Sequence, residues 1–380
     1  MKAIYMDHAA TSPVHPQVIE AMMSSLRSDF GNPSSIHQFG RKTRHALDEA
    51  RSSIAISINA HPNEIIFTSG GTEADNLAII GTAKANRHKG HHIITTVIEH
   101  HAVLNACKGL ENEGFEVTYL PVDETGRISI GSLQRAIRPE TILLTVMFGN
   151  NEVGTIQPIE EIAQVAKEHQ IIFHTDAVQA YGLVELDVSE LGVDMLSVSA
   201  HKINGPKGVG FLYVKDGTKL VPYSHGGEQE RKRRAGTENV AGIVGLQRSA
   251  ELFHVDREEK SVLYHKMKEA MSTIFDDEEI EYHVNGDQSN VLPHVFNVSF
   301  PGAGVEPMLM NLDLAGIAVS SGSACTAGSH EPSHVLTAML GDNERTQTAI
   351  RFSFGYGNSI EDAKTAAQEV VKIVNRLKKL

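Results

Sequence analysis

The sequence predicts an α/β protein with a mostly parallel β-sheet in its larger part and a smaller α/β part towards its C-terminal end. Short apolar runs rich in β-branched residues alternate with stretches of helical periodicity such as Glu160–Glu168, and this alternation is typical of successive β-α-β units. The apolar runs are almost continuous, as expected of parallel strands that helices cover on both faces. The predicted strands are Glu64–Thr68, His92–Ile98, Thr141–Met147, Ile171–Thr175, Asp194–Val198 and Val209–Val214.

The remainder of the chain has a different order of elements. A long helical pattern follows Asn239 and runs to about Phe275. Strands followed by grouped helices indicate a second α/β domain. We therefore predict a large domain of residues 16–255 and a small domain of residues 1–15 and 256–380. Its elements are three strands, Val295–Phe300, Ile317–Ser320 and Ile350–Phe354, and a terminal amphipathic helix from Ser359 towards Leu380.

Composition is that of an ordinary globular protein, with 41% hydrophobic and 21% charged residues. The formal net charge of -13 repels phosphate backbones, so we expect no direct contact with nucleic acid. The basic run Arg231–Arg234 is flanked by acidic residues and predicts a solvated loop. No apolar run approaches the roughly 18 residues that span a bilayer, and Asp7 and His8 interrupt the place of a signal peptide. We expect a cytoplasmic protein without membrane contact.

The chain has only two cysteines, Cys107 and Cys325, which are too few for a disulfide framework or a cysteine-rich metal site. Cys107 lies in an amphipathic helical pattern and is expected in the core. Cys325 lies in S-S-G-S-A-C-T-A-G-S, residues 320–329, whose small side chains cannot bury a thiol. Nearby hydroxyl and backbone N–H groups could hydrogen-bond to a thiolate, so we interpret Cys325 as a reactive nucleophile.

The twenty histidines raise the question of a metal site, above all His88, His91 and His92, or Glu99 with His100 and His101. No H-E-x-x-H motif is present, and neighbouring histidines on a strand point to opposite faces of the sheet. We therefore predict no metal.

Polar residues follow three of the predicted strands, where ligands of parallel sheets bind. Gly71 and Thr72 open a helix after Glu64–Thr68 and could cradle a phosphate with backbone N–H groups. Asp176 and Gln179 follow the strand Ile171–Thr175. Ser199, His201 and Lys202 follow the next strand. An aspartate after one strand and a lysine after the next is what a pyridoxal phosphate enzyme requires, because the aspartate keeps the pyridine nitrogen protonated and the lysine bonds to the aldehyde.

Ordered motifs along almost the whole chain resemble the cysteine desulfurases of the NifS/IscS class, within the fold-type I pyridoxal phosphate enzymes. The resemblance implies a fold-type I transferase, with a seven-stranded, mostly parallel sheet in the large domain and a small α/β domain that carries the Cys325 loop. The motifs are Y-M-D-H-A-A-T-S-P (5–13), F-G-N-P-S-S-I-H (30–37), F-T-S-G-G-T-E-A-D-N (67–76), E-H-H-A-V (99–103), G-N-N-E-V-G (149–154), H-T-D-A-V-Q (174–179), S-A-H-K-I-N-G-P-K-G (199–208), R-R-A-G-T-E-N (233–239), S-S-G-S-A-C (320–325) and R-F-S-F-G (351–355).

The resemblance also implies roles for single residues. Lys202 would bind the cofactor covalently, with Asp176 on the ring nitrogen and Gln179 on the phenolic oxygen. His100 would stack on the ring and transfer protons, while Asn151 and Arg351 would hold the substrate carboxylate. The cofactor phosphate would be held by Gly71, Thr72, Ser199, His201 and, from the partner subunit of a homodimer, Thr237.

The implied reaction converts L-cysteine to L-alanine and leaves the sulfur on Cys325 as a persulfide, for transfer to an acceptor protein. Housekeeping members continue past the last helix in a short tail that docks the iron–sulfur scaffold, whereas this sequence ends at Lys378–Leu380. A tRNA 2-thiouridylase is thus as reasonable an acceptor as the scaffold. Alternatives are a selenocysteine lyase or another pyridoxal phosphate carbon–sulfur lyase. An aminotransferase would not need Cys325, and a non-catalytic sulfur relay would not need Lys202 with Asp176.

Overall fold

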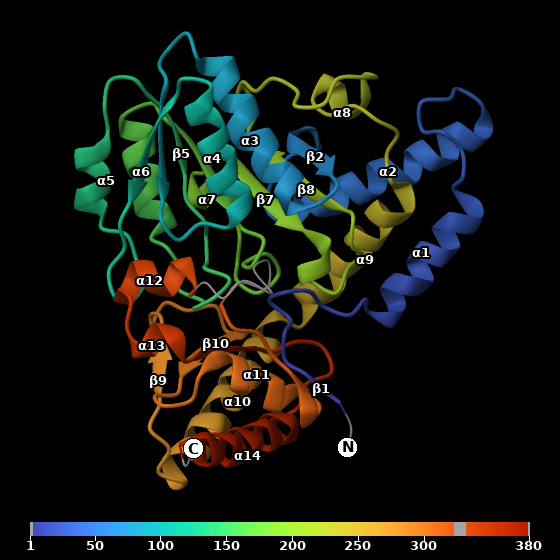
Figure 1. Ribbon diagram of the computed structural model, residues 1–380. Helices are drawn as coiled ribbons and strands as arrows, with labels where there is room; N and C mark the ends of the chain where they lie inside the picture. The colour runs from blue at the N-terminus through green and yellow to red at the C-terminus, as the bar shows by residue number, and fades with distance from the viewer. Residues whose placement is uncertain (1–2, 323–331, 379–380) are drawn as a thin grey trace.

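The computed structural model describes residues 3–322 and 332–378 of the chain (Figure 1). Cys325 lies outside the described residues. In Figure 1 a large sheet with its covering helices forms the upper part of the molecule, and the C-terminal strands and helices form the lower part.

A seven-stranded sheet is the centre of the upper part. Its strand order is β2-β8-β7-β6-β5-β3-β4. Only β8 runs antiparallel to its neighbours, whereas β7, β6, β5, β3 and β4 are mutually parallel. The predicted seven-stranded, mostly parallel sheet is therefore confirmed. Its strands are β2 (Ile65–Thr68), β3 (His92–Thr96), β4 (Glu116–Leu120), β5 (Thr141–Thr145), β6 (Ile172–Asp176), β7 (Met195–Ser199) and β8 (Gly210–Val214).

All six strands predicted for this sheet occur, with ends shifted by one or two residues. The strand that the sequence did not predict is β4, which pairs only with β3 at the edge of the sheet. Most of its side chains are partly exposed, so it lacks the continuous apolar pattern by which the buried strands were found.

Helices cover both faces of the sheet. One face packs against α3 (Gly71–Asn86) and α4 (His101–Asn112). Cys107 is fully buried in this layer, as predicted. The other face packs against helices that include α2, α6 and α9. Bounds of the remaining helices of this part are α1 (Pro16–Ser28), α2 (Gln38–Ile56), α5 (Ile130–Ala136), α6 (Ile159–Glu168), α7 (Val188–Leu191), α8 (Gln229–Lys232) and α9 (Val240–Val255), with the 3-10 turns Pro62–Glu64 and Ala200–Lys202.

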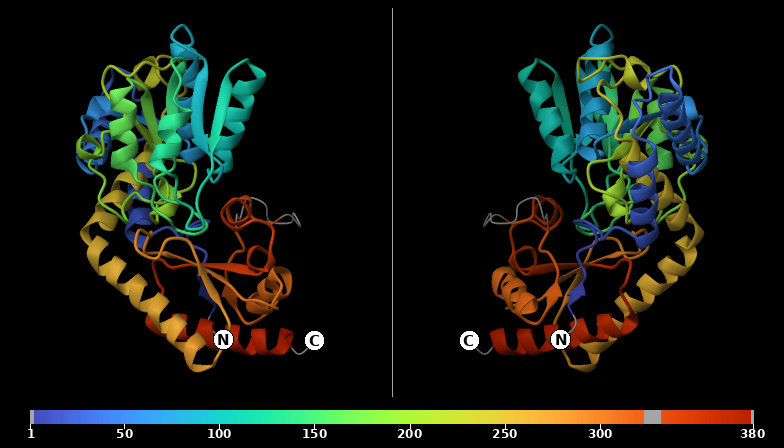
Figure 2. Two further views of the ribbon diagram at one scale, coloured as in Figure 1. Left: turned by 90° about the vertical axis from the view of Figure 1, so that its left-hand side faces the viewer. Right: turned by 90° about the vertical axis from the view of Figure 1, so that its right-hand side faces the viewer.

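The lower part contains a three-stranded antiparallel sheet in the order β12-β10-β9. The long helix α10 (Arg257–Asp277) descends from the upper part and packs against α14 (Ile360–Leu377) at the bottom of the molecule (Figure 2). The other elements are β9 (His283–Asn285), β10 (Val295–Ser299), α11 (Val305–Leu314), α12 (His334–Leu340), α13 (Glu344–Gln347) and β12 (Ala349–Ser353).

The N-terminal end of the chain joins this lower part. Strand β1 (Ile4–Tyr5) pairs in parallel with β11 (Ile317–Ala318). This pairing favours the division into residues 16–255 and residues 1–15 with 256–380, which stays a prediction. Among the described residues, no helix combines the length and the apolar character needed to cross a membrane.

Candidate active site

A cavity of about 230 Å³ lies at the ends of the parallel strands. Every predicted site residue in the described part of the chain lines it, except Thr237. The predicted residues at the cavity are Gly71, Thr72, His100, Asn151, Asp176, Gln179, Ser199, His201, Lys202 and Arg351, and the cavity is also lined by Ala9, Ala10, Asp75, Met147, Gly149 and Val178.

Lys202 enters the cavity from the 3-10 turn that follows β7. Its Nζ donates to the backbone oxygens of Ala9, at 2.5 Å, and Ala10, at 2.8 Å. The nearby Lys207 does not line this cavity. Lys202 is therefore the lysine that the fold places beside the other predicted residues.

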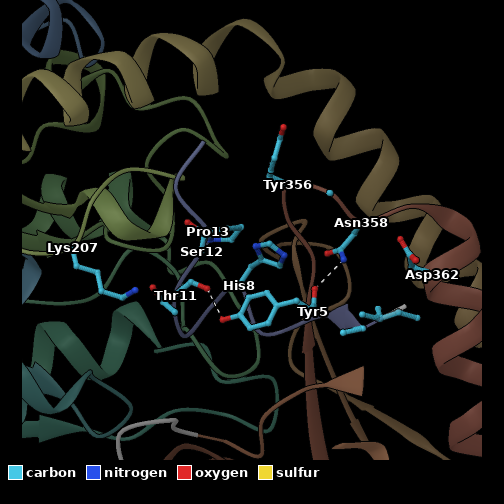
Figure 3. Close-up of a pocket in the computed structure, with 12 residues that line it drawn as sticks. Tyr5, His8, Thr11, Ser12, Pro13, Lys207, Tyr356, Asn358 and Asp362 are labelled. Atoms are coloured by element: carbon cyan, nitrogen blue, oxygen red, sulfur yellow. Dashed lines mark hydrogen bonds between the residues drawn. The ribbon is translucent and has the colours of Figure 1, made fainter. Parts of the chain in front are cut away.

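The N-terminal segment that supplies these two oxygens is fixed at both ends. The Tyr5 hydroxyl donates to the Thr11 oxygen at 2.8 Å, and the Asn358 side chain donates to the Tyr5 oxygen at 2.9 Å (Figure 3). The Ser12 hydroxyl donates to the backbone oxygen of His201 at 2.7 Å. Figure 3 shows a separate hollow of about 410 Å³ beside this segment. Sequence reasoning missed Ala9 and Ala10 because they contribute only backbone atoms, although the motif of residues 5–13 contains them.

Asp176 ends strand β6 and is buried. One of its carboxyl oxygens accepts from the backbone N–H of Val178 at 2.9 Å. Burial raises the pKa of Asp176, and the nearby His100 and Lys202 act in the opposite direction. A buried carboxylate beside cationic groups is suited to hold a protonated ring nitrogen.

Two further buried carboxyl groups were not predicted as site residues. Asp75 lines the cavity, and burial together with the charge of Asp176 raises its pKa well above the usual value. The Nε2 atom of His174 lies 3.6 Å from Asp75, but burial lowers the pKa of His174 to about 3, so this contact is not an ion pair. Burial also raises the pKa of Glu99 to about 8. Asp75 gave no signal of its own in the sequence, since it lies inside a motif dominated by other residues, and Glu99 was considered only as a possible metal ligand.

The start of α3 lines the same cavity as Lys202 and has the features of an anion-binding site. Gly70 has a φ of 149° and Gly71 is the first residue of the helix. A Cβ atom on Gly71 would lie 2.7 Å from Val178 Cγ2, so the close approach requires glycine. An ideal Cβ on Gly70 would meet the Ser199 hydroxyl at 3.5 Å. These backbone N–H groups, the helix dipole and the hydroxyl together suit a phosphate.

His201 and His100 both have defined ring orientations. Nδ1 of His201 lies 3.1 Å from the Thr11 hydroxyl, and burial lowers the pKa of His201 to about 4. His100 caps α4, because its Nδ1 accepts from the backbone N–H of Ala102 at 3.1 Å. A neutral His100 ring therefore carries its proton on Nε2.

Arg351 comes from β12 in the lower part and is almost completely buried. It donates to the backbone oxygen of Asn151 at 2.8 Å and to the Asp7 carboxylate at 2.9 Å. Its Nε is buried and has no hydrogen-bond partner within the described ranges. A buried guanidinium with one unpartnered nitrogen, on a side chain that lines a cavity, favours an anionic ligand such as a carboxylate. Asp7 is a further contact that sequence reasoning did not assign.

Thr237 is exposed and lies between α8 and α9. It therefore takes no part in the cavity of its own chain as far as the chain is described. The described residues also contain no group of three His, Cys, Asp or Glu side chains that could hold a metal ion. Both ring nitrogens of His92 instead contact the hydroxyls of Thr141 and Thr118.

Comparison with known proteins assigns this geometry to a family. Residues 4–365 match the family model described as aminotransferase class-V. A provisionally named cysteine desulfurase IscS 1 of Bacillus subtilis (strain 168) is 58% identical over 99% of this chain and 100% of its own. Cysteine desulfurase IscS of Methanosarcina thermophila is 50% identical over 100% of this chain and 94% of its own.

Solved structures agree with the sequence relatives. A NifS-like protein has a TM-score of 0.93 at 35% identity, covering 98% of this chain and 100% of that one. SspA in complex with cysteine has a TM-score of 0.82 at 40% identity, covering 92% of this chain and 98% of that one. The class-V aminotransferase family is dependent on pyridoxal phosphate, and this chain belongs to that family and, within it, to the cysteine desulfurases.

Proposed function

We propose that the protein binds pyridoxal 5'-phosphate at the cavity and converts L-cysteine to L-alanine, with transfer of the sulfur to Cys325. The observation that carries the proposal is that Lys202, Asp176, the N-terminus of α3 and Arg351 all line one cavity. The relatives named cysteine desulfurase support the reaction. The solved complex of SspA with cysteine supports the substrate.

The cavity residues fit four functional groups of the cofactor. Lys202 would join the aldehyde, and Asp176 would hold the pyridine nitrogen in its protonated form. Gly71, Thr72, Ser199 and His201 would hold the phosphate, with Gln179 on the phenolic oxygen. When bound, pyridoxal phosphate withdraws electrons from the α-carbon of an amino acid and so makes its α-proton acidic.

The protein's own groups would then orient the substrate and carry protons. Arg351 and Asn151 would hold the carboxylate, so that the α-proton of L-cysteine faces Lys202, which would accept it. His100, with its ring proton on Nε2, would exchange protons with the substrate. In the sulfur transfer the Cys325 thiolate attacks the substrate sulfur. The carbon–sulfur bond breaks, a sulfur–sulfur bond forms, and carbon takes a proton in place of sulfur.

The acceptor of the sulfur and the assembly are part of the same proposal. We infer that Cys325 passes its sulfur to a tRNA 2-thiouridylase or to an iron–sulfur scaffold in the cytoplasm. A homodimer would bring Thr237 of each subunit to the phosphate held by the other. The exposure of Thr237 in a single chain supports this arrangement.

The Cys325→Ala variant tests the division of work between Lys202 and Cys325. The variant should bind pyridoxal phosphate and L-cysteine but should release no alanine, because it lacks the thiolate that takes the sulfur. Cys107→Ala is the matched control and should keep full activity, since Cys107 is buried and burial raises its pKa above the usual thiol value. In the wild type, mass spectrometry of peptides should find one extra sulfur on Cys325.

Extra sulfur on Cys107, or full alanine production by Cys325→Ala, would contradict the proposal and leave a generic carbon–sulfur lyase. Selenocysteine serves as the competing substrate in the same assay. If Cys325→Ala still releases alanine from selenocysteine and from cysteine alike, a lyase that does not use Cys325 is the correct description.

A further inference from the structure

His294 is a buried histidine that the proposed mechanism does not use. It directly precedes β10 in the lower part of the molecule, and its backbone oxygen accepts from the N–H of Phe354 at 2.8 Å. Its side chain nevertheless contacts a residue that lines the active-site cavity, since Nε2 lies 3.0 Å from Oε1 of Gln179. The exposed fractions of His294 and Gln179 are 3% and 6%.

The orientation of the Gln179 amide follows from its second contact. Its Nε2 donates to the backbone oxygen of Ala9 at 2.9 Å. A carbonyl oxygen can only accept, so the NH2 group of Gln179 must face Ala9 and its Oε1 must face His294. His294 then has to donate, which places a proton on its Nε2.

The surroundings of His294 leave its ring neutral. Burial lowers the pKa of His294 well below the usual value, and Lys268, His8, Arg351 and Lys202 add to this effect. Nδ1 is buried and has no hydrogen-bond partner in the part of the chain that the structure describes. The single ring proton of a neutral histidine is therefore the one that Gln179 receives.

The fixed amide determines that Gln179 offers a hydrogen-bond donor, not an acceptor, to the cavity. Because the contacts with Ala9 and His294 fix the amide, Gln179 cannot rotate by half a turn and exchange its NH2 group for Oε1 at the cavity. One of the two N–H bonds of that group is directed to Ala9, which leaves the other for the cavity. A ligand atom at this place must be an acceptor, such as a phenolate oxygen.

We propose that His294 is a positioning residue that fixes the Gln179 amide so that the active site offers an N–H donor to the phenolic oxygen of the cofactor. The inference rests on the proposed binding of pyridoxal phosphate. His294 does not line the cavity, but it would control the hydrogen bond that Gln179 donates inside the cavity.

The test compares holoenzymes that keep or lose the donor at position 294. His294→Leu removes the donor, whereas His294→Gln places an amide nitrogen at the same reach. A donor to the phenolic oxygen favours its ionised form, so its loss should raise the pH midpoint of the cofactor's visible absorption band by about half a unit to one unit, as expected for one hydrogen bond. His294→Gln should stay close to wild type. His294→Met replaces His294→Leu if the latter does not fold.

A double-mutant cycle separates positioning from simple packing. Gln179→Leu should shift the midpoint as His294→Leu does, and the double variant should shift it no further. His254→Leu is the control, because His254 also has a buried Nε2 without a partner in the described chain but lies away from the cavity. A wild-type midpoint in His294→Leu, or additive shifts in the double variant, would overturn the inference.

The four proteins of this cycle (wild type, the two single variants and the double variant) are also measured without cofactor. These measurements test the His294–Gln179 contact independently of cofactor binding. Urea unfolding should show that the losses of stability from His294→Leu and Gln179→Leu are not additive, since both remove the same contact. A wild-type protein that develops no visible band with pyridoxal phosphate would contradict the proposed function, whereas additive unfolding energies would contradict the His294–Gln179 pair.

Discussion

Backbone oxygens hold the side chains at the centre of the candidate site. The Ala9 oxygen accepts from both Lys202 and Gln179, and the Ala10 oxygen accepts from Lys202. Side-chain patterns in a sequence indicate which groups can react, and here they indicated Lys202, Asp176 and Gln179. They do not indicate which distant carbonyl groups hold those side chains, because every residue has the same carbonyl. The structure adds this layer of contacts.

At Arg351 we expect a defect in substrate binding when the charge is kept but the planar guanidinium is lost. Arg351→Lys should raise KM for L-cysteine by roughly tenfold to a hundredfold, in line with the loss of a charge-assisted pair of hydrogen bonds. The cofactor spectrum should stay unchanged. Asp7→Asn is the control, since it weakens the ion pair with Arg351 but leaves the guanidinium in place. An unchanged KM in Arg351→Lys would mean that another group binds the substrate carboxylate.

At Glu99 we expect stability to fall as the pH rises. Its oxygens accept from the Thr96 hydroxyl at 2.7 Å and from the Met147 N–H at 3.0 Å, yet burial raises its pKa to about 8. The folded protein therefore binds a proton that the unfolded chain releases near pH 4.5. Between those two values this group lowers the free energy of unfolding by at most about 1.4 kcal/mol per pH unit.

Glu99→Gln should remove that contribution, because the neutral amide can still accept from Met147 and has no proton to lose. Urea unfolding at pH 6 and pH 8.5 measures it. The stability of the variant relative to wild type should increase with pH. An equal difference at both pH values would show that the folded and unfolded chains ionise Glu99 alike.

Among the elements, the short helix α8 has an unusual backbone. Glu230, Arg231 and Lys232 have φ values of 46°, 55° and 66°, in the left-handed region that non-glycine residues avoid. Glu230 fixes this turn, since its buried carboxylate accepts from Arg51 at 2.6 and 2.8 Å and from the Phe67 N–H at 3.0 Å. The basic run Arg231–Arg234 thus directly follows a residue, Glu230, whose buried ion pair with Arg51 fixes the backbone of this turn. The sequence indicated a solvated loop for this run; Arg231 and Lys232 are exposed, whereas Arg233 and Arg234 are half-buried and Arg234 pairs with Glu73 at 2.8 Å.

Lys232→Gly should therefore stabilise the protein. Glycine adopts a φ of 66° without strain, so the substitution removes the strain of the left-handed backbone. This should outweigh the entropic cost of ordering a glycine and raise the free energy of unfolding by about 0.5–1 kcal/mol. The exposed pair with Glu228, 3.1 Å apart, contributes little. Lys364→Gly in the middle of α14 is the control and should destabilise by about 1 kcal/mol. Urea midpoints measure both, and a loss of stability in both would mean that Lys232 is not strained.

Elements with a strong apolar pattern could be predicted from the sequence. The positions of the other elements depend on tertiary contacts. The inner strands β3, β5, β6 and β7 are rich in apolar residues and buried along almost their whole length, as expected of strands in a doubly covered sheet. The two-residue strand β1 has no such pattern, because its place follows from pairing with β11. The predicted helix to Phe275 is two helices, α9 and α10, separated at Asp256, whose φ and ψ of −106° and 17° interrupt the helix.

For the whole molecule, the active site depends on contacts between its upper and lower parts. Arg351 from β12 bonds to Asn151 in the upper part and to Asp7 in the N-terminal segment. His294 bonds to Gln179 across the same boundary. The sequence placed all of these residues except Asp7 and His294 in the site, through motifs. It could not show that the lower part supports the cofactor-binding residues, because that depends on how the two parts pack.

Complementation can test the proposed assembly of two chains. If Thr237 serves the partner's site, Lys202→Ala on one chain and Thr237→Glu on the other impair the same site of a mixed dimer. The chain with Thr237→Glu keeps its own Lys202 and receives an intact Thr237 from the Lys202→Ala chain. Mixed dimers isolated through two affinity tags should therefore have about half of the wild-type activity, because one of the two sites is intact.

Each variant alone should be inactive, since a glutamate repels the phosphate it should bind. Pairing Lys202→Ala with Asp176→Asn is the control and should restore no activity, because both residues lie in one cavity of one chain. Failure of the first pair to recover would place Thr237 outside the partner's phosphate site.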